Sequence, residues 1–140
     1  MAVDFDALIS LWSTRISSIP AAIEAFGRFY SDPLRINGVE TSLAALAQRA
    51  LSTQSAFSEL SAVVLDRSDT ETHSTIVFRM RGRHVGPLET PLGIVPATGK
   101  MIERQIIDLL KVERGLITEV WMVGDELSAL MQLGALAPAF

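Results

Sequence analysis

The sequence predicts an α+β fold in which a strongly bent antiparallel sheet wraps around amino-terminal helices. Two observations support this prediction. Apolar residues recur at three- and four-residue steps through roughly the first sixty residues, as in amphipathic helices. Later segments of alternating apolar and polar residues are separated by polar or glycine-bearing turns, as in an antiparallel meander. The length of 140 residues fits one domain over residues 1–140.

Side chains that can cap helices mark two of the expected helices. Asp4 can accept the free amides of a first helix, whose apolar stripe runs from Phe5 to Ile16. Thr41 or Ser42 can cap a third helix over residues 43–51. Both helices are expected to bury one face.

A second helix is expected between these two. It starts at Pro20, a residue suited to a first helical turn, and places Phe26 and Tyr30 on one face. The run at residues 31–33 should end it, and residues 34–39 predict a short strand.

Four longer strands and a short helix follow. The strands are expected at residues 60–66, 73–84, 102–112 and 116–123, and Gly134 should close the helix. The connection at residues 85–100 holds three prolines and three glycines, too many for regular structure. A connection of that length indicates a lid or the mouth of a site.

Strand alternation divides residues 74–84 into two rows. Met80 and His84 belong to an apolar row, whereas Arg79, Arg81 and Arg83 point to the other face. A histidine at the end of an apolar row can act as a general base, or it can be a core residue held by a backbone hydrogen bond.

The same alternation places Ile117, Glu119, Trp121 and Val123 on one face of the last strand. If Trp121 faces a cavity, Glu119 does too, and a carboxyl beside an indole in an apolar pocket suits proton transfer. Alternatively, Trp121 packs against a partner subunit with Glu119 at its rim. The period alone leaves both open.

Two aspartates have competing interpretations. Asp125 immediately precedes the last helix, so it is either an N-cap or an acid/base group. Asp108 shares a strand face with Arg104, so the two can form an ion pair at the surface or at a pocket floor. The aromatic residues Trp12, Phe26 and Tyr30 can line a cavity or form ordinary core.

Composition excludes several classes of function. The formal net charge of −4 lacks the electrostatic footprint of a nucleic-acid-binding protein. No cysteine, glycine-rich phosphate loop or paired-histidine spacing is present, so thiol catalysis, nucleotide chemistry and a metal site lack support. We therefore expect neither a metal nor an organic cofactor.

Nothing in the sequence indicates a membrane or an export signal. No apolar run approaches the roughly 18 residues needed to cross a bilayer. The first residues, Met1 to Asp6, carry two acids, and no Lys or Arg precedes Arg15, the reverse of a signal peptide. We expect a soluble, cytoplasmic protein.

Several short motifs follow one another in the second half of the chain. They are Gly-x-His-x-Gly at 82–86, Pro-x-Thr-Gly-Lys at 96–100, Ile-Asp-Leu at 107–109, Glu-x-Trp at 119–121, Asp-x-Leu at 125–127 and Gln-Leu-Gly at 132–134. In this order they resemble the SnoaL-like polyketide cyclases, a branch of the nuclear-transport-factor-2-like superfamily. No single motif is specific by itself.

The resemblance implies a cone-shaped fold, a homodimer through the outer face of the sheet, and an apolar pocket for a hydrophobic small molecule. It also implies cofactor-free aldol ring closure, with Asp125 or Glu119 moving the proton and His84 assisting. The expected ligand-binding residues are Trp12, Phe26, Tyr30, Met80, Arg104 and Trp121.

One departure from the family pattern keeps other functions open. Met122 and Val123 stand where many relatives carry an acid or another polar group just after the tryptophan. A non-catalytic binding module is the alternative, because one fold hosts many functions. An epoxide hydrolase or an isomerase is less well supported, since no aspartate occurs in residues 74–86.

Overall fold

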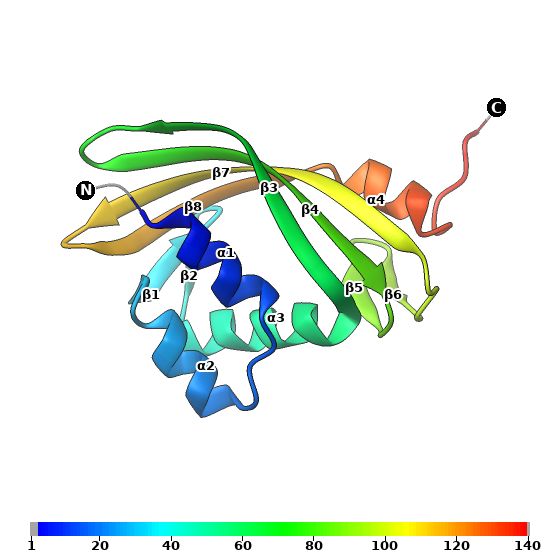
Figure 1. Cartoon of the computed structure of the whole chain (residues 1–140), viewed down its shortest axis with the longest axis horizontal. Helices are drawn as coiled ribbons and strands as arrows, with labels where there is room; N and C mark the ends of the chain where they lie inside the picture. Colours follow the sequence, from blue (N-terminus) through cyan, green and yellow to red (C-terminus); the bar gives the residue numbers. More distant parts are fainter. Residues whose placement is uncertain (1–2, 140) are drawn as a thin grey trace.

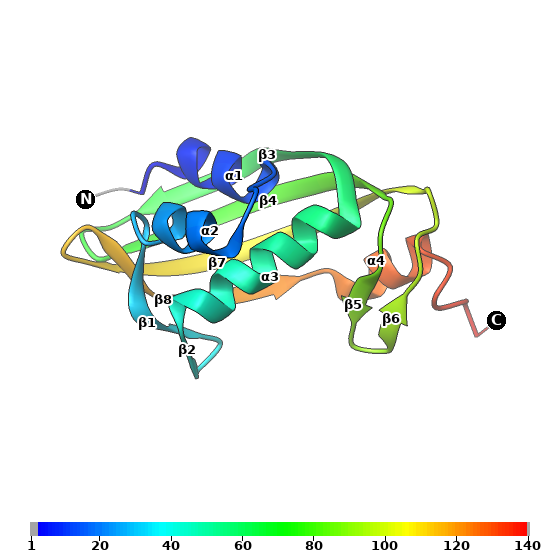
Figure 2. The same ribbon diagram turned by 90° about the horizontal axis from the view of Figure 1, so that it is seen from below.

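A computed structural model describes residues 3–139, so Met1 and Ala2 of the amino-terminal segment lie outside it. A six-stranded sheet in the order β2-β1-β8-β7-β4-β3 curves over helices α1, α2 and α3, which lie on its concave side (Figures 1 and 2). A fourth helix, α4, follows the last strand at one end of the sheet. The expected α+β architecture with a bent sheet is confirmed.

The helix starts follow the capping side chains. Asp4 accepts the Ala7 amide at 3.1 Å at the start of α1 (Phe5–Ser13). Ser42 accepts the Ala45 amide at 3.1 Å at the start of α3 (Leu43–Ala56). Each hydroxyl or carboxylate satisfies an amide that has no partner within the helix.

The second helix differs from the prediction. Helix α2 (Ile19–Phe26) ends four residues before Tyr30, which begins strand β1 (Tyr30–Ile36) rather than extending the helix. The Ile117 amide donates to the Phe29 carbonyl at 2.7 Å, so pairing with β8 sets the chain direction here. The predicted strand at 34–39 is instead the end of β1 and the start of β2 (Val39–Thr41).

The four long strands are confirmed, three of them with longer ends. They are β3 (Phe57–Asp69), β4 (His73–His84), β7 (Met101–Glu113) and β8 (Leu116–Gly124). Antiparallel pairing joins β3 to β4, β4 to β7, and β7 to β8, whereas β1 and β8 run parallel. The sheet is therefore mixed at the β1–β8 pair.

The connection between β4 and β7 is not irregular throughout. Strands β5 (Leu88–Thr90) and β6 (Gly93–Val95) form a small hairpin beside the carboxyl end of α3 (Figures 1 and 2). Its turn depends on Gly93, whose φ of +114° strains other residues, and on Thr90, whose hydroxyl donates to the Gly93 carbonyl at 2.7 Å. The expectation of no regular structure in residues 85–100 is wrong.

The core fills most of the space under the sheet. Apolar side chains from α1, α2 and α3 meet the concave face, and the largest fully buried ones are Phe26, Leu34, Ile76, Leu110 and Ile117. Gln54 in α3 is also buried, donating to the Leu11 and Trp12 carbonyls and accepting the Ile16 amide. This one amide attaches the end of α1 to α3.

Helix α4 (Glu126–Gln132) covers part of the β7 edge that β8 leaves unpaired. The Gln132 side chain accepts the Glu103 amide at 2.8 Å and donates to the Glu103 carbonyl at 2.8 Å, as a neighbouring strand would. Within residues 3–139, no helix is both long and apolar enough to cross a membrane.

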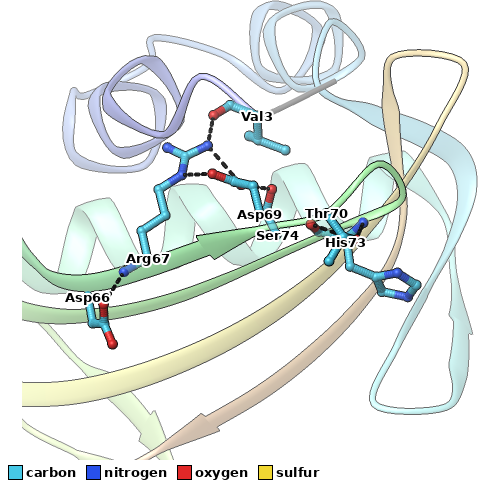
Figure 3. Close-up of polar contacts among 7 residues, drawn as sticks. All are labelled: Val3, Asp66, Arg67, Asp69, Thr70, His73 and Ser74. Carbon is cyan, nitrogen blue, oxygen red and sulfur yellow. Dashed lines mark hydrogen bonds and ion pairs between the residues drawn. The ribbon is translucent and has the colours of Figure 1, made fainter.

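A polar cluster at the far end of β3 and β4 holds the amino-terminal segment (Figure 3). Arg67 donates from Nε to Asp69 at 2.9 Å and from Nη2 to the Val3 carbonyl. Ser74, almost fully buried, donates to the same carboxylate at 2.5 Å. The bonds from Arg67 and then Ser74 lower the pKa of Asp69.

Candidate functional site

A cavity of about 180 Å³ lies between the concave face of the sheet, helix α4 and the β5–β6 hairpin. Its apolar wall includes Phe57, Leu60, Met80, Leu88, Ile102 and Leu130. Of the expected ligand-binding residues, Met80 and Arg104 line it. A small hollow therefore exists at one end of the sheet.

A bulge in β3 and a glycine in β4 shape this wall. The β3–β4 register shifts between Ser58 and Ser61, where Glu59 adopts a φ of +56°. A Cβ on Gly82 would lie 2.9 Å from Leu60 Cδ2 and 3.1 Å from Phe57 Cδ1. Glycine at position 82 therefore leaves the space that these two side chains occupy.

The cavity has one strongly polar end, formed by an ion pair. Arg104 Nη1 donates to Glu126 Oε1 in a short contact, with the two side chains 30% and 42% exposed. A Cβ on Gly124 would lie 3.2 Å from that carboxylate oxygen and 3.5 Å from Arg104 Cδ. A charged pair thus borders an apolar hollow.

His84 lies beyond Gly82 in the same row and is fully buried. Its Nδ1 accepts the Thr98 amide at 3.2 Å and lies 2.9 Å from the Thr98 hydroxyl. Because a backbone amide can only donate, Nδ1 is the acceptor in this contact, while Nε2 has no partner within residues 3–139. The placement is that of a core histidine held by a backbone hydrogen bond.

The second glycine of the Gly-x-His-x-Gly motif, Gly86, lies where the chain passes close to the end of α3. Its amide donates to the Ala56 carbonyl at 3.1 Å, and a Cβ at this position would lie 2.5 Å from the Ser55 carbonyl oxygen. The chain leaving β4 therefore passes against the end of α3 at a separation that only glycine permits.

Glu119 and Trp121 lie on the outer face of the sheet, away from the cavity. Thr118 is an extra residue in β8, because Val112 pairs with Ile117 while Lys111 pairs with Glu119. The bulge turns Ile117 and Val120 into the core and leaves Trp121 48% exposed. The expectation that Ile117 and Trp121 share a face is wrong.

The Trp121 indole is nevertheless held in place. Its Nε1 donates to Glu119 Oε1 at 2.6 Å, and Gly38 in the β1–β2 turn lies beside the ring. The indole and its carboxylate partner therefore lie on the outer face of the sheet.

Asp125 is the N-cap of α4. Its Oδ1 accepts the Ser128 amide at 3.0 Å, which confirms the capping interpretation of its position.

Trp12, Phe26 and Tyr30 pack against one another in the core instead of lining the cavity. Trp12 and Phe26 meet edge to face at 5.1 Å, and Phe26 stacks on Tyr30 at 5.9 Å. Trp12 Nε1 donates to the Tyr30 hydroxyl at 3.0 Å. Burial is the main reason that the pKa of Tyr30 is raised well above its usual range.

Asp108 is the most unusual acid of the described chain. It lies on the concave face of β7 opposite Ile76, between the buried Ile106 and Leu110. Burial raises its pKa from 3.8 to about 7, against a smaller opposing effect of Arg104. The residue keeps some exposure, but its Oδ1 is buried and has no hydrogen-bond partner within residues 3–139.

Sequence reasoning treated Asp108 mainly as a surface partner of Arg104 and left it out of the site. The available signal was its place in the row Ile102, Arg104, Ile106, Asp108, Leu110, where a carboxylate interrupts an apolar face. Its carboxylate also lies close enough to Tyr30 to contribute to the raised pKa of the phenol. This effect is smaller than that of burial itself.

Asp108 lies far from the other polar residues considered for the site. His84 lies eight residues along β4 from Ile76, the partner of Asp108, a separation of roughly 26 Å. Arg104 and Asp108 are four residues apart on β7, or roughly 13 Å. No cluster of three or more metal-binding side chains occurs in residues 3–139.

A family model described as SnoaL-like polyketide cyclase matches residues 8–133 of this chain. The match includes the cavity lining, Asp108, His84 and the motifs of the second half, apart from Gly134 at the end of the last motif. No curated protein matches the chain.

Solved structures with similar folds include three informative neighbours. TsrD from Streptomyces laurentii is 22% identical, with 94% of this chain and 92% of that chain covered and a TM-score of 0.77. A SnoaL-like polyketide cyclase from Agrobacterium tumefaciens is 16% identical, with 96% and 100% covered and a TM-score of 0.71.

The third neighbour is a protein with a ketosteroid isomerase-like fold from Catenulispora acidiphila. It is 15% identical, with 96% of each chain covered and a TM-score of 0.67. At these identities the similarities establish the fold alone.

Proposed function

Because the chain belongs to the SnoaL-like polyketide cyclase family, we propose that it catalyses cofactor-independent acid/base chemistry of the aldol type on a hydrophobic small molecule. Asp108 is the proposed proton-transfer group. The observation that carries this proposal is its pKa of about 7 on the concave face, with a buried oxygen left without a partner.

The chemistry needs one acid that works in both directions. Near neutral pH both forms of Asp108 are populated. The carboxylate removes a proton from a carbon next to a carbonyl, and the resulting enolate carbon attacks a second carbonyl to form a C–C bond. The carboxylic acid then returns the proton to the new alkoxide oxygen.

The test is turnover of a polyketide ester that can close by aldol addition. We expect Asp108→Asn to lose at least about 100-fold in turnover, since general acid–base catalysis contributes that much, and to unfold at a temperature no lower than that of wild type. Glu119→Gln, on the outer face, is the matched carboxylate control. Full turnover in Asp108→Asn, or a selective loss in Asp125→Asn, contradicts the assignment.

A non-catalytic binding module is the second candidate, and one observation favours it. Asp108 is not among the residues that line the cavity. On its face of β7, the buried Ile106 separates Asp108 from Arg104, which does line the cavity. Under this alternative, hydrophobic ligands raise the melting temperature of wild type and Asp108→Asn equally, and no ester is turned over.

We also propose that two copies associate through the outer face of the sheet. An outer patch of Val77, Ile107, Leu109, Trp121 and Val123 supports this proposal. Trp121 and Val123 are 48% and 72% exposed there, which is unusual for a sheet face in contact with water.

The surroundings of the outer patch also suit a self-complementary contact. Arg79 and Glu103 form an ion pair of 2.8 Å on the same face, and Lys111 lies opposite Glu119. An apolar centre with a rim of both charges fits an isologous dimer, in which each patch meets its own copy.

A further inference from the structure

The proposed aldol chemistry gives no role to the Arg104–Glu126 ion pair at the charged end of the cavity. We propose that the cavity binds a small carboxylic acid with a single ring or a short branched body, and that Arg104 binds its carboxylate. In the free protein, Glu126 occupies the position of the ligand's carboxylate. The inference stands apart from the proposed function, because Asp108 is not among the residues that line this cavity.

The size of the cavity limits the body of the ligand. Its volume is about 180 Å³. An apolar cavity of roughly 150 Å³ accepts one benzene ring, whereas pockets for larger ligands measure roughly 300–1,000 Å³. A single ring fits between Leu60, Met80 and Ile102, but a fused tetracyclic system does not.

The guanidinium of Arg104 has unused capacity for an anion. Within residues 3–139 it makes one hydrogen bond, from Nη1 to Glu126, of the five that its planar fork can donate. Guanidinium groups bind carboxylates in a bidentate manner. A ligand carboxylate therefore gains a second hydrogen bond that the Glu126 contact does not use.

Glu126 is free to leave. It is the first residue of α4, but Asp125 caps that helix, so the fold does not depend on the Glu126 carboxylate. Its side chain is 42% exposed, so moving into water costs little.

The charges around the cavity favour exchange of one carboxylate for another. Arg104 and Glu126 form a neutral pair at this end of the cavity. Replacing Glu126 by a ligand carboxylate preserves this balance beside Arg104, whereas a neutral ligand leaves the original pair in place.

Chemical-shift titration of the protein at pH 7.5 with benzoate and with its neutral counterpart benzamide tests the proposal. We expect benzoate to bind about 10-fold more tightly than benzamide, the effect of one charge-assisted hydrogen bond. Glu126→Gln should tighten benzoate binding about 3-fold or more, because the internal competitor is weakened. Arg104→Gln should abolish the preference for benzoate, and Arg79→Gln, an arginine on the outer face, should retain it.

The size limit has its own probe. We expect 2-naphthoate to bind at least about 10-fold more weakly than benzoate, because overpacking a filled site costs 1–3 kcal/mol.

Four results would overturn the inference: equal affinity for benzoate and benzamide, a preference that survives Arg104→Gln, weaker benzoate binding in Glu126→Gln, or 2-naphthoate binding as tightly as benzoate. If Arg104→Gln does not fold, the wild-type and Glu126→Gln titrations still decide. Benzoate binding is measured without turnover, so Asp108→Asn separates the two proposals. Full turnover in that variant refutes the role of Asp108, whereas its preference for benzoate over benzamide tests the cavity alone.

Discussion

Arg104 and Asp108 share one face of β7, four residues apart, yet Arg104 pairs with Glu126, and Asp108 has no ion-pair partner among residues 3–139. The sequence suggested that these two charges neutralise each other. Because they do not, burial is the largest effect on the Asp108 carboxyl and raises its pKa to about 7. The proposed chemistry and the expected pH dependence of stability both follow from this raised pKa of Asp108.

The first prediction concerns stability against pH. Asp108 has a pKa of about 7 when folded and 3.8 when unfolded, so between these values the folded state binds the additional proton. The contribution of this group is therefore greatest below pH 3.8 and falls as pH rises towards 7, by at most about 4 kcal/mol. Urea unfolding at several pH values from 5 to 8.5 measures it.

Asp108→Asn isolates this effect, because asparagine has nearly the same shape and does not ionise. The difference in unfolding free energy between the variant and wild type should grow in favour of the variant as pH rises from 5 to 8.5. Asp69, whose pKa is lowered, titrates below this range and does not interfere. A difference that stays constant with pH would show that the pKa of Asp108 is not raised in the folded protein.

The second prediction concerns the Gly-x-His-x-Gly motif. Gly86→Ala places a Cβ 2.5 Å from the Ser55 backbone carbonyl, which cannot rotate away, so it should lower the unfolding free energy by about 1–3 kcal/mol. Gly124→Ala is the control, because its nearest neighbour is the flexible Glu126 side chain at 3.2 Å. Urea unfolding compares the two, and an equal loss in both would contradict the backbone explanation.

The third prediction separates capping from catalysis at Asp125. Asp125→Ala removes the acceptor of the Ser128 amide and should cost about 0.5–2 kcal/mol, whereas asparagine caps nearly as well as aspartate. Thermal unfolding and ester turnover are measured on both variants. A stable Asp125→Asn that has lost turnover would restore Asp125 as the proton-transfer group.

The fourth prediction concerns assembly. If the outer patch joins two copies, Trp121→Ala and Val123→Asp should weaken association at least about 30-fold, as expected for a central aromatic anchor or a buried unpaired charge. Light scattering after size-exclusion chromatography gives the mass. Leu92→Asp, at a site 61% exposed on the β5–β6 connection, should leave it unchanged. A wild-type monomer at every concentration would refute the dimer.

Local features of the sequence predicted most of the elements correctly. Asp4 and Ser42 mark helix starts because a side-chain oxygen satisfies nearby amides, an interaction confined to a few residues. The alternation from Ser74 to His84 gives the inward row because β4 is paired on both sides without a bulge between β4 and β7. Such features do not depend on distant parts of the chain.

The failures occur where distant segments decide the local structure. Tyr30 fits a helical stripe, but pairing with β8 places it in a strand. Nothing in the sequence around Thr118 indicates a bulge, yet the register shift between β7 and β8 places Ile117 and Trp121 on opposite faces of the sheet.

The sequence by itself determined the α+β class, the caps and the order of motifs, because these depend on periodicity and short-range hydrogen bonds. Only the tertiary structure decided which acid is buried and which is exposed. Glu119, Asp125 and Asp108 are alike as carboxyl side chains. Their differences arise from an outward-facing indole, a helix start and an apolar concave face that the fold assembles from distant segments.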